Sequence, residues 1–139
     1  MEAVRLVLVF GLVLALLACK DPYDFEPGDP TKPDPPASPE LVAPADSWQS
    51  DSYIYPQEIS FSFRAIPGAG FYQFEVYRDS LLRSQYLFFS DSRLTQTSVT
   101  ASLPYYGVYF WRVRAASRNW NDYTAWSRPF WFGLPNPAR

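Results

Sequence analysis

The 139-residue sequence contains no histidine and a single cysteine, Cys19. Without histidine, the chain cannot form a Ser-His-Asp or a Cys-His catalytic centre, and zinc sites built on histidine or cysteine ligands are excluded. A lone cysteine also excludes a disulfide within the chain. A glycine-rich phosphate-binding loop is absent as well. We therefore expect no metal and no cofactor.

Strong charge of either sign is also lacking, because the formal net charge is only −2 and no lysine-rich run occurs. Nucleic acid is therefore not expected as a partner. The acids of residues 41–139 are scattered over predicted turns and strands. They show no pair placed for acid–base glycoside hydrolysis, which needs two carboxyl groups facing one cleft. The sequence predicts a protein that is not an enzyme.

The N-terminus holds a 13-residue apolar run, Leu6 to Ala18, that follows Arg5. A helix of that length is too short to cross a bilayer core of about 30 Å, and the run is typical of a signal-peptide core. Its end, Leu16-Leu17-Ala18-Cys19, resembles the bacterial lipobox. The resemblance implies cleavage of residues 1–18 and acylation of Cys19, with palmitate among the chains, which would anchor the protein to a lipid bilayer.

Residues 20–40 are rich in proline and acid, with seven of the 14 prolines and a net charge of −4. Proline removes backbone donors and like charges repel, so this composition predicts a disordered, extended tether over residues 19–40. At about 3.1 Å per residue, the 21 residues 20–40 would span up to about 65 Å. Lys20 followed by acids also resembles the signal that exports some lipoproteins to the surface of the outer membrane. Pro22 interrupts that pattern, and a spacer facing the periplasm is the alternative.

Residues 41–139 hold 23 aromatic residues and several short alternating runs. "EISFSFR" places Ile59, Phe61 and Phe63 on one face, and "FYQFEVYR" repeats the pattern after the turn "PGAG". "TSVTASL", "GVYFWRVRA" and "SRPFWFG" follow. Short strands every 10 to 12 residues or so are typical of an all-β sandwich. Residues 79–90 fit either a short strand near 85–89, which we favour, or a helix.

Four stretches of this domain resemble fibronectin type III-like modules of bacterial exported proteins: "LVAPAD", "FSFRAIPGAGFYQFEV", "LPYYGVYFWRVRA" and "AWSRPFWF". The resemblance covers residues 40–133 and implies an immunoglobulin-like sandwich of about seven strands. Its most specific part is Leu103, six residues before Tyr109. That spacing implies a tyrosine corner, in which the hydroxyl group ties the preceding loop to the strand.

In "YFWRVRA", alternation from Tyr109 places Trp111 in the core and Arg112 and Arg114 on the outer sheet face. Guanidinium groups among aromatic rings resemble the Trp-Arg ladders of related receptor modules. The residues predicted for such an outer-face ladder are Tyr77, Arg112, Arg114, Trp126 and Trp131. The ladder either stiffens the sheet, which we favour, or forms a binding face.

The loop "SRNWNDYTA" (117–125) is the candidate recognition element. Asn119, Trp120, Asn121 and Tyr123 lie in a polar stretch without alternation, and amphipathic rings beside amides suit a protein hot spot or sugar stacking. For Trp120 itself, the interpretation that we favour is that its ring folds back over the end of the sandwich. Trp48 and Tyr53 to Tyr55 are expected near the opposite end.

These features predict a non-catalytic interaction module that is anchored in the bacterial outer membrane and exposed on the cell surface, with a periplasm-facing position as the alternative. Its partner would be an envelope protein complex in which it has an accessory or structural role. A surface glycan, bound in the service of polysaccharide uptake, is the alternative. A lone module favours the protein partner, whereas the abundance of aromatic residues favours the glycan.

Overall fold

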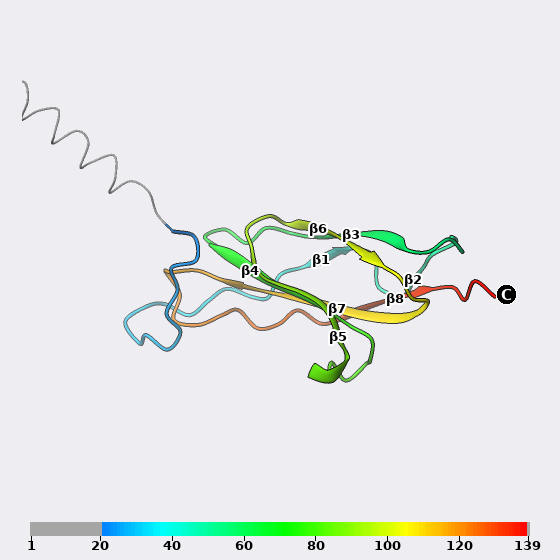
Figure 1. The fold of residues 1–139 in the computed structure, drawn as a ribbon. Coiled ribbons are helices and arrows are strands. Elements are labelled where there is room, and N and C mark those ends of the chain that lie inside the picture. Colours follow the sequence, from blue (N-terminus) through cyan, green and yellow to red (C-terminus); the bar gives the residue numbers. More distant parts are fainter. Residues whose placement is uncertain (1–20, 139) are drawn as a thin grey trace, which may run out of the picture.

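A computed structural model describes residues 21–138, which form two packed antiparallel sheets (Figure 1). The first sheet has the order β1 (Leu41–Ala43), β3 (Gln57–Phe63), β6 (Ser98–Leu103). The second has the order β2 (Trp48–Gln49), β8 (Phe130–Leu134), β7 (Gly107–Ala116), β4 (Phe71–Tyr77), β5 (Leu87–Leu94). Only the short β2 pairs in parallel, with β8. The predicted all-β, fibronectin type III-like sandwich is confirmed.

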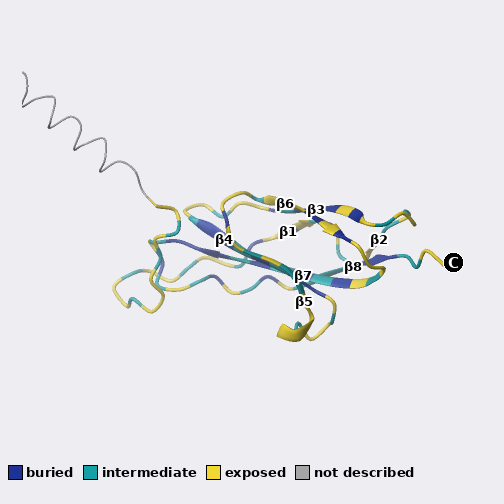
Figure 2. Cartoon of the chain, in the orientation of Figure 1, coloured by how far each residue is buried: buried dark blue, intermediate teal, exposed yellow. Residues whose placement is uncertain are grey.

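The alternation read from the sequence matches the buried faces of the strands (Figure 2). Phe61 is fully buried at the centre of the core. Its ring lies 4.9 Å from Phe74, 5.2 Å from Trp111 and 5.7 Å from Phe132, measured between centroids. All three contacts are edge-to-face, the arrangement that aromatic quadrupoles favour. Rings from both sheets therefore interlock around one residue of β3.

The predicted tyrosine corner is present. The Tyr109 hydroxyl group donates a hydrogen bond to the backbone oxygen of Tyr105 at 2.7 Å, and the Tyr109 ring stacks on Phe132. Burial raises the pKa of the Tyr109 hydroxyl group above its usual value. The loop before β7 is thereby fixed to its own strand.

Residues 79–90, for which either a strand or a helix was possible, contain both a helical turn and the start of a strand. A 3₁₀ turn, η1, covers Ser84–Tyr86, and β5 begins directly after it at Leu87. The Asp79 carboxylate accepts hydrogen bonds from the backbone and the guanidinium group of Arg83, which closes the preceding loop. The strand therefore begins near the predicted position but continues further, to Leu94, because it pairs with β4 over most of that strand's length.

The prediction of a free tether is wrong for the described part of residues 19–40. Tyr23 and Phe25 pack on Phe71, with ring centroids at 5.6 and 6.1 Å. Proline and like charges favour an extended chain, but these two rings gain free energy by leaving water. We call residues 21–34 the docked segment.

Replacement of Trp111 by alanine should lower the free energy of unfolding by about 3 to 5 kcal/mol, because a fully buried indole leaves a cavity. Arg112→Ala, one residue further on the outer face, should cost only about 1 to 2 kcal/mol through lost stacking and an unpaired Glu75. Chemical denaturation of both variants checks this order. A larger loss for Arg112→Ala would show that the facing of β7 is reversed.

Candidate functional site

The loop 117–125 does not present Trp120 to solvent. The Trp120 side chain is only 7% exposed and belongs to the core cluster, beside Gly68 at the end of the sandwich. The favoured interpretation, that Trp120 folds back over the end of the sandwich, is therefore confirmed, and the alternative of Trp120 as a recognition residue is wrong. The ring caps the open end of the two sheets, where alternation along a strand no longer applies.

The chain after Trp120 runs along β7 as an irregular extra strand. Thr124 exchanges hydrogen bonds with Ala115, through its backbone N–H group and its hydroxyl oxygen, at 2.9 and 3.0 Å. Ser127 repeats this arrangement with Val113, at 2.9 and 3.0 Å. Both side chains are buried, so the polar residues of this loop complete the sheet.

Asn121 binds the chain's own docked segment. Its backbone oxygen accepts a hydrogen bond from Gly28 at 2.6 Å, and its backbone N–H group donates to Pro33 at 2.9 Å. Its amide side chain donates to an Asp34 carboxylate oxygen at 2.6 Å. Asn119 is the member of the predicted set that stays exposed. Asn121, which was predicted to hold a ligand, therefore holds Gly28, Pro33 and Asp34 instead.

Four of the five predicted ladder residues lie together on the outer face of the five-stranded sheet. The Arg112 guanidinium carbon lies 4.1 Å from the centroid of Trp126 and 5.5 Å from that of Tyr77. The Arg114 guanidinium carbon lies 4.5 Å from the Trp126 centroid and 3.8 Å from that of Tyr123. Tyr123 takes the place of Trp131 as the fifth member. Along the sheet the side chains follow the order Tyr77, Arg112, Trp126, Arg114, Tyr123, and we call these five residues the ladder.

Trp131 lies in β8, next to the inward-facing Phe132, and is not part of the ladder. In the described part of the chain no guanidinium group stacks on its ring. Its backbone N–H group donates to the Asp46 carboxylate at 3.2 Å, and Arg128 binds the same carboxylate at 2.8 Å. The hydrogen bond from Arg128 is the largest influence that lowers the pKa of Asp46.

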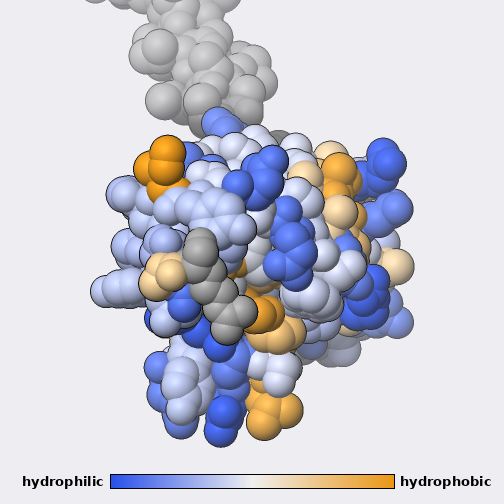
Figure 3. Space-filling view, turned by 90° about the vertical axis from the view of Figure 1, so that its right-hand side faces the viewer, coloured by the Kyte–Doolittle hydropathy of each residue, from blue (hydrophilic) through white to orange (hydrophobic). Residues whose placement is uncertain are grey.

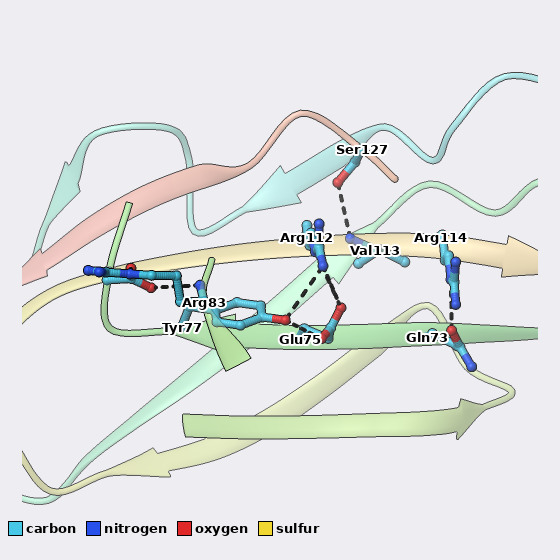
Figure 4. A network of polar contacts seen from close by, with 9 residues as sticks. Gln73, Glu75, Tyr77, Arg83, Arg112, Val113, Arg114 and Ser127 are labelled. Carbon is cyan, nitrogen blue, oxygen red and sulfur yellow. Dashed lines mark hydrogen bonds and ion pairs between the residues drawn. The ribbon is translucent and has the colours of Figure 1, made fainter. Parts of the chain in front are cut away.

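The polar groups of the ladder are paired across β4 and β7 (Figure 4). Arg112 forms an ion pair with Glu75 at 3.1 Å, and Arg114 donates to the Gln73 side chain at 2.7 Å. The Tyr77 hydroxyl group also donates to Glu75. Burial, followed by this bond to Glu75, raises the pKa of Tyr77. A ladder whose donors already have acceptors works as reinforcement of the sheet rather than as a binding face.

Exposed apolar side chains gather instead at the other end of the sandwich, where β4, β6 and β8 end and β3, β5 and β7 begin. We call this end the distal pole, because the docked segment lies at the opposite end (Figure 1). Its exposed large side chains are Tyr53, Ile54, Leu81, Tyr86, Leu87, Tyr105, Tyr106 and Val108. Ile54 is 79% exposed and Tyr105 is 55% exposed. Figure 3 faces this end and shows several hydrophobic patches among hydrophilic residues.

A cavity of about 320 Å³ lies within the distal pole, lined by Tyr55, Arg78, Pro104, Tyr105, Tyr106 and Pro137. Arg78 donates to the backbone oxygen of Tyr106 at 3.2 Å, and its guanidinium carbon lies 5.2 Å from the Tyr105 centroid. Sequence reasoning expected Tyr53 to Tyr55 here but missed Tyr105 and Tyr106. The signal was present in "PYYG", where two large rings occupy a turn that has no strand to bury them.

The predicted acylation site, Cys19, lies outside the described residues, as does the predicted signal peptide. Within residues 21–138, no helix has the length and apolar character needed to cross a membrane. Nor does any group of three or more acidic or cysteine side chains in those residues form a possible metal site.

Comparison with family models and with curated proteins finds no match for this sequence. Among the solved structures that match is the crystal structure of a Fn3-like protein from Clostridium thermocellum, with 22% sequence identity and a TM-score of 0.47. The match covers 72% of this chain and 94% of that protein. The strand order and the tyrosine corner of the chain itself define its fold.

If Trp120 caps the sandwich, Trp120→Ala should destabilise the domain by about 3 to 5 kcal/mol, as expected for a large core ring. Trp48→Ala is the matched control, since that indole is 39% exposed and should cost roughly 1 kcal/mol or less. Thermal and chemical unfolding of the two variants measure the difference. Equally small losses of stability in the two variants would show that Trp120 lies on the surface.

Proposed function

We propose that this chain is a non-catalytic interaction module of the bacterial cell envelope, anchored to the outer membrane through acylated Cys19, that presents its distal pole to a partner protein. The observation that supports it best is the separation of two features. The docked segment, which continues to Cys19, lies at one end of the sandwich, and the exposed apolar side chains gather at the other.

The chemistry of the distal pole suits a protein partner. Ile54, Leu81 and Val108 are aliphatic and exposed, and the rings of Tyr105 and Tyr106 at the same end of the sandwich are exposed as well. Aliphatic groups gain from burial against another protein, whereas sugar recognition depends on ring faces and polar groups. Exposed tyrosines among aliphatic neighbours are typical anchors of protein interfaces.

The proposed role is that of an accessory or structural lipoprotein in a larger outer-membrane complex. The acidic residues that follow Lys20 support a place on the cell surface rather than on the periplasmic side. The pairing of the ladder residues and the capping role of Trp120 also support the distal pole over the loop 117–125 as the contact surface.

A surface glycan is the second candidate ligand, and the cavity beside Arg78 favours it. Tyr55, Tyr105 and Tyr106 line this cavity together with Arg78, and its volume of about 320 Å³ is near the lower limit of ligand pockets at about 300 Å³. Such a site would select a saccharide that carries a carboxylate. Titration with uronic-acid oligosaccharides, followed by tyrosine fluorescence, distinguishes the two ligands. Glycan binding requires a saturable response that Arg78→Ala removes.

If the partner is a protein, the double variant Tyr105→Ala, Tyr106→Ala should no longer co-purify with that partner from native membranes. Hot-spot rings contribute about 2 kcal/mol or more each, so the pair should weaken binding by roughly a thousandfold. The fold should persist, because the Tyr109 hydroxyl group and Arg78 bind backbone oxygens that both substitutions keep.

Val42→Asp is the matched control, since Val42 is 45% exposed but lies in β1, away from the distal pole. It should retain the partner recovered with the unmodified chain. Retention by the tyrosine double variant, or loss by Val42→Asp, would contradict the assignment of the interface.

A further inference from the structure

We propose that the docked segment seats the sandwich directly on the membrane surface, with the end that carries Trp120 toward the lipid headgroups, rather than letting it swing on a long tether. This inference rests on the proposed acylation of Cys19. It adds a second interaction surface, whose partner is the headgroup layer of the bilayer.

First, Tyr23 and Phe25 hold the docked segment firmly against the sandwich. The Tyr23 ring packs at a tilt on Phe71, and the Arg93 guanidinium carbon lies 3.9 Å from the Tyr23 centroid. The Tyr23 hydroxyl group donates to the Arg93 backbone oxygen at 3.0 Å. Phe25 packs edge-on to Phe71 and Tyr123, the latter at 4.6 Å. Phe71 faces outward from β4 yet is only 6% exposed, because these two rings cover it.

The second step is the reach of the chain. Only four residue steps separate Cys19 from Tyr23, and an extended chain covers at most about 3.6 Å per step, or about 14 Å in all. A free 21-residue tether would allow about 65 Å. The headgroup layer on each side of the hydrocarbon core is itself about 5 to 7 Å thick. The docked end of the sandwich must therefore lie at or very near the headgroups.

The third step is the surface that this end presents. Around the start of the docked segment lie Asp21, Pro22, Arg118 and Asn119. The chain passes so close to Gly70 that a Cβ atom there would lie 2.5 Å from the Pro22 oxygen, which fixes glycine at this position. Mixed charge and amide groups suit contact with headgroups and not insertion into hydrocarbon. The distal pole then points away from the membrane by roughly the length of β7, about 33 Å for ten residues.

The experiment uses the acylated full chain in phosphatidylcholine vesicles that contain a small fraction of acceptor-labelled lipid. Acylation blocks the sulfur of Cys19, and the chain has no other cysteine, so one introduced cysteine takes a donor dye. Asn119→Cys reports the docked end, and Ile54→Cys reports the distal pole. We expect strong energy transfer to the lipid from position 119 and much weaker transfer from position 54. Equal transfer from both positions overturns the proposal.

Two further variants test the role of the docked segment. Tyr23→Ala together with Phe25→Ala should free the segment and remove the difference between the two dye positions; a persisting difference overturns the proposal. Insertion of about ten Gly and Ser residues after residue 20 leaves the docking contacts intact, and should lower transfer from position 119 because the added chain is flexible. Unchanged transfer after insertion also overturns it.

Vesicle flotation separates this inference from the anchor on which it depends. A chain that floats but shows equal transfer from both positions refutes only the seated orientation. A chain that does not float with the vesicles refutes the acyl anchor, and the orientation with it.

Discussion

The packing of Tyr23 and Phe25 on Phe71 decides which surfaces of this molecule are available. These rings cover the outer face of β4 at one end of the sandwich, and the chain that follows them binds Asn121 through three hydrogen bonds. The loop that would otherwise be a recognition element is thereby occupied. The distal pole, where Tyr105 and Tyr106 remain exposed, is the surface that the proposed interaction would use.

Many of the aromatic residues have one of two structural roles, and only rings outside both sets remain for binding. One set, around Phe61, interlocks the two sheets, and a second set alternates with Arg112 and Arg114 on the outer face. Edge-to-face contacts and guanidinium stacking each contribute about 0.5 to 2 kcal/mol, so they matter through their number. Because β7 supplies residues to both sets, the stability of the domain depends on that strand most of all.

Residues that obey strand periodicity could be predicted from the sequence alone. The inward facing of Trp111 and the tyrosine corner at Tyr109 follow from local alternation and spacing, which the sheet enforces. Trp120 could not be placed in this way, because its burial depends on the open end of the sandwich rather than on its neighbours in sequence. The docking of Tyr23 could not be predicted either, since its partner Phe71 lies 48 positions away in the sequence.

Hydrogen exchange of the backbone across residues 21–34, detected by mass spectrometry on the acylated full chain, tests the docking most directly. The amide of Gly28 donates to the Asn121 oxygen at 2.6 Å, and the amide of Asn121 donates to the Pro33 oxygen. We expect the peptide containing Gly28 to exchange far more slowly than an unstructured chain, and we expect Tyr23→Ala with Phe25→Ala to remove this protection. Exchange of that peptide at the unstructured rate, while the strands of the core stay protected, would contradict it.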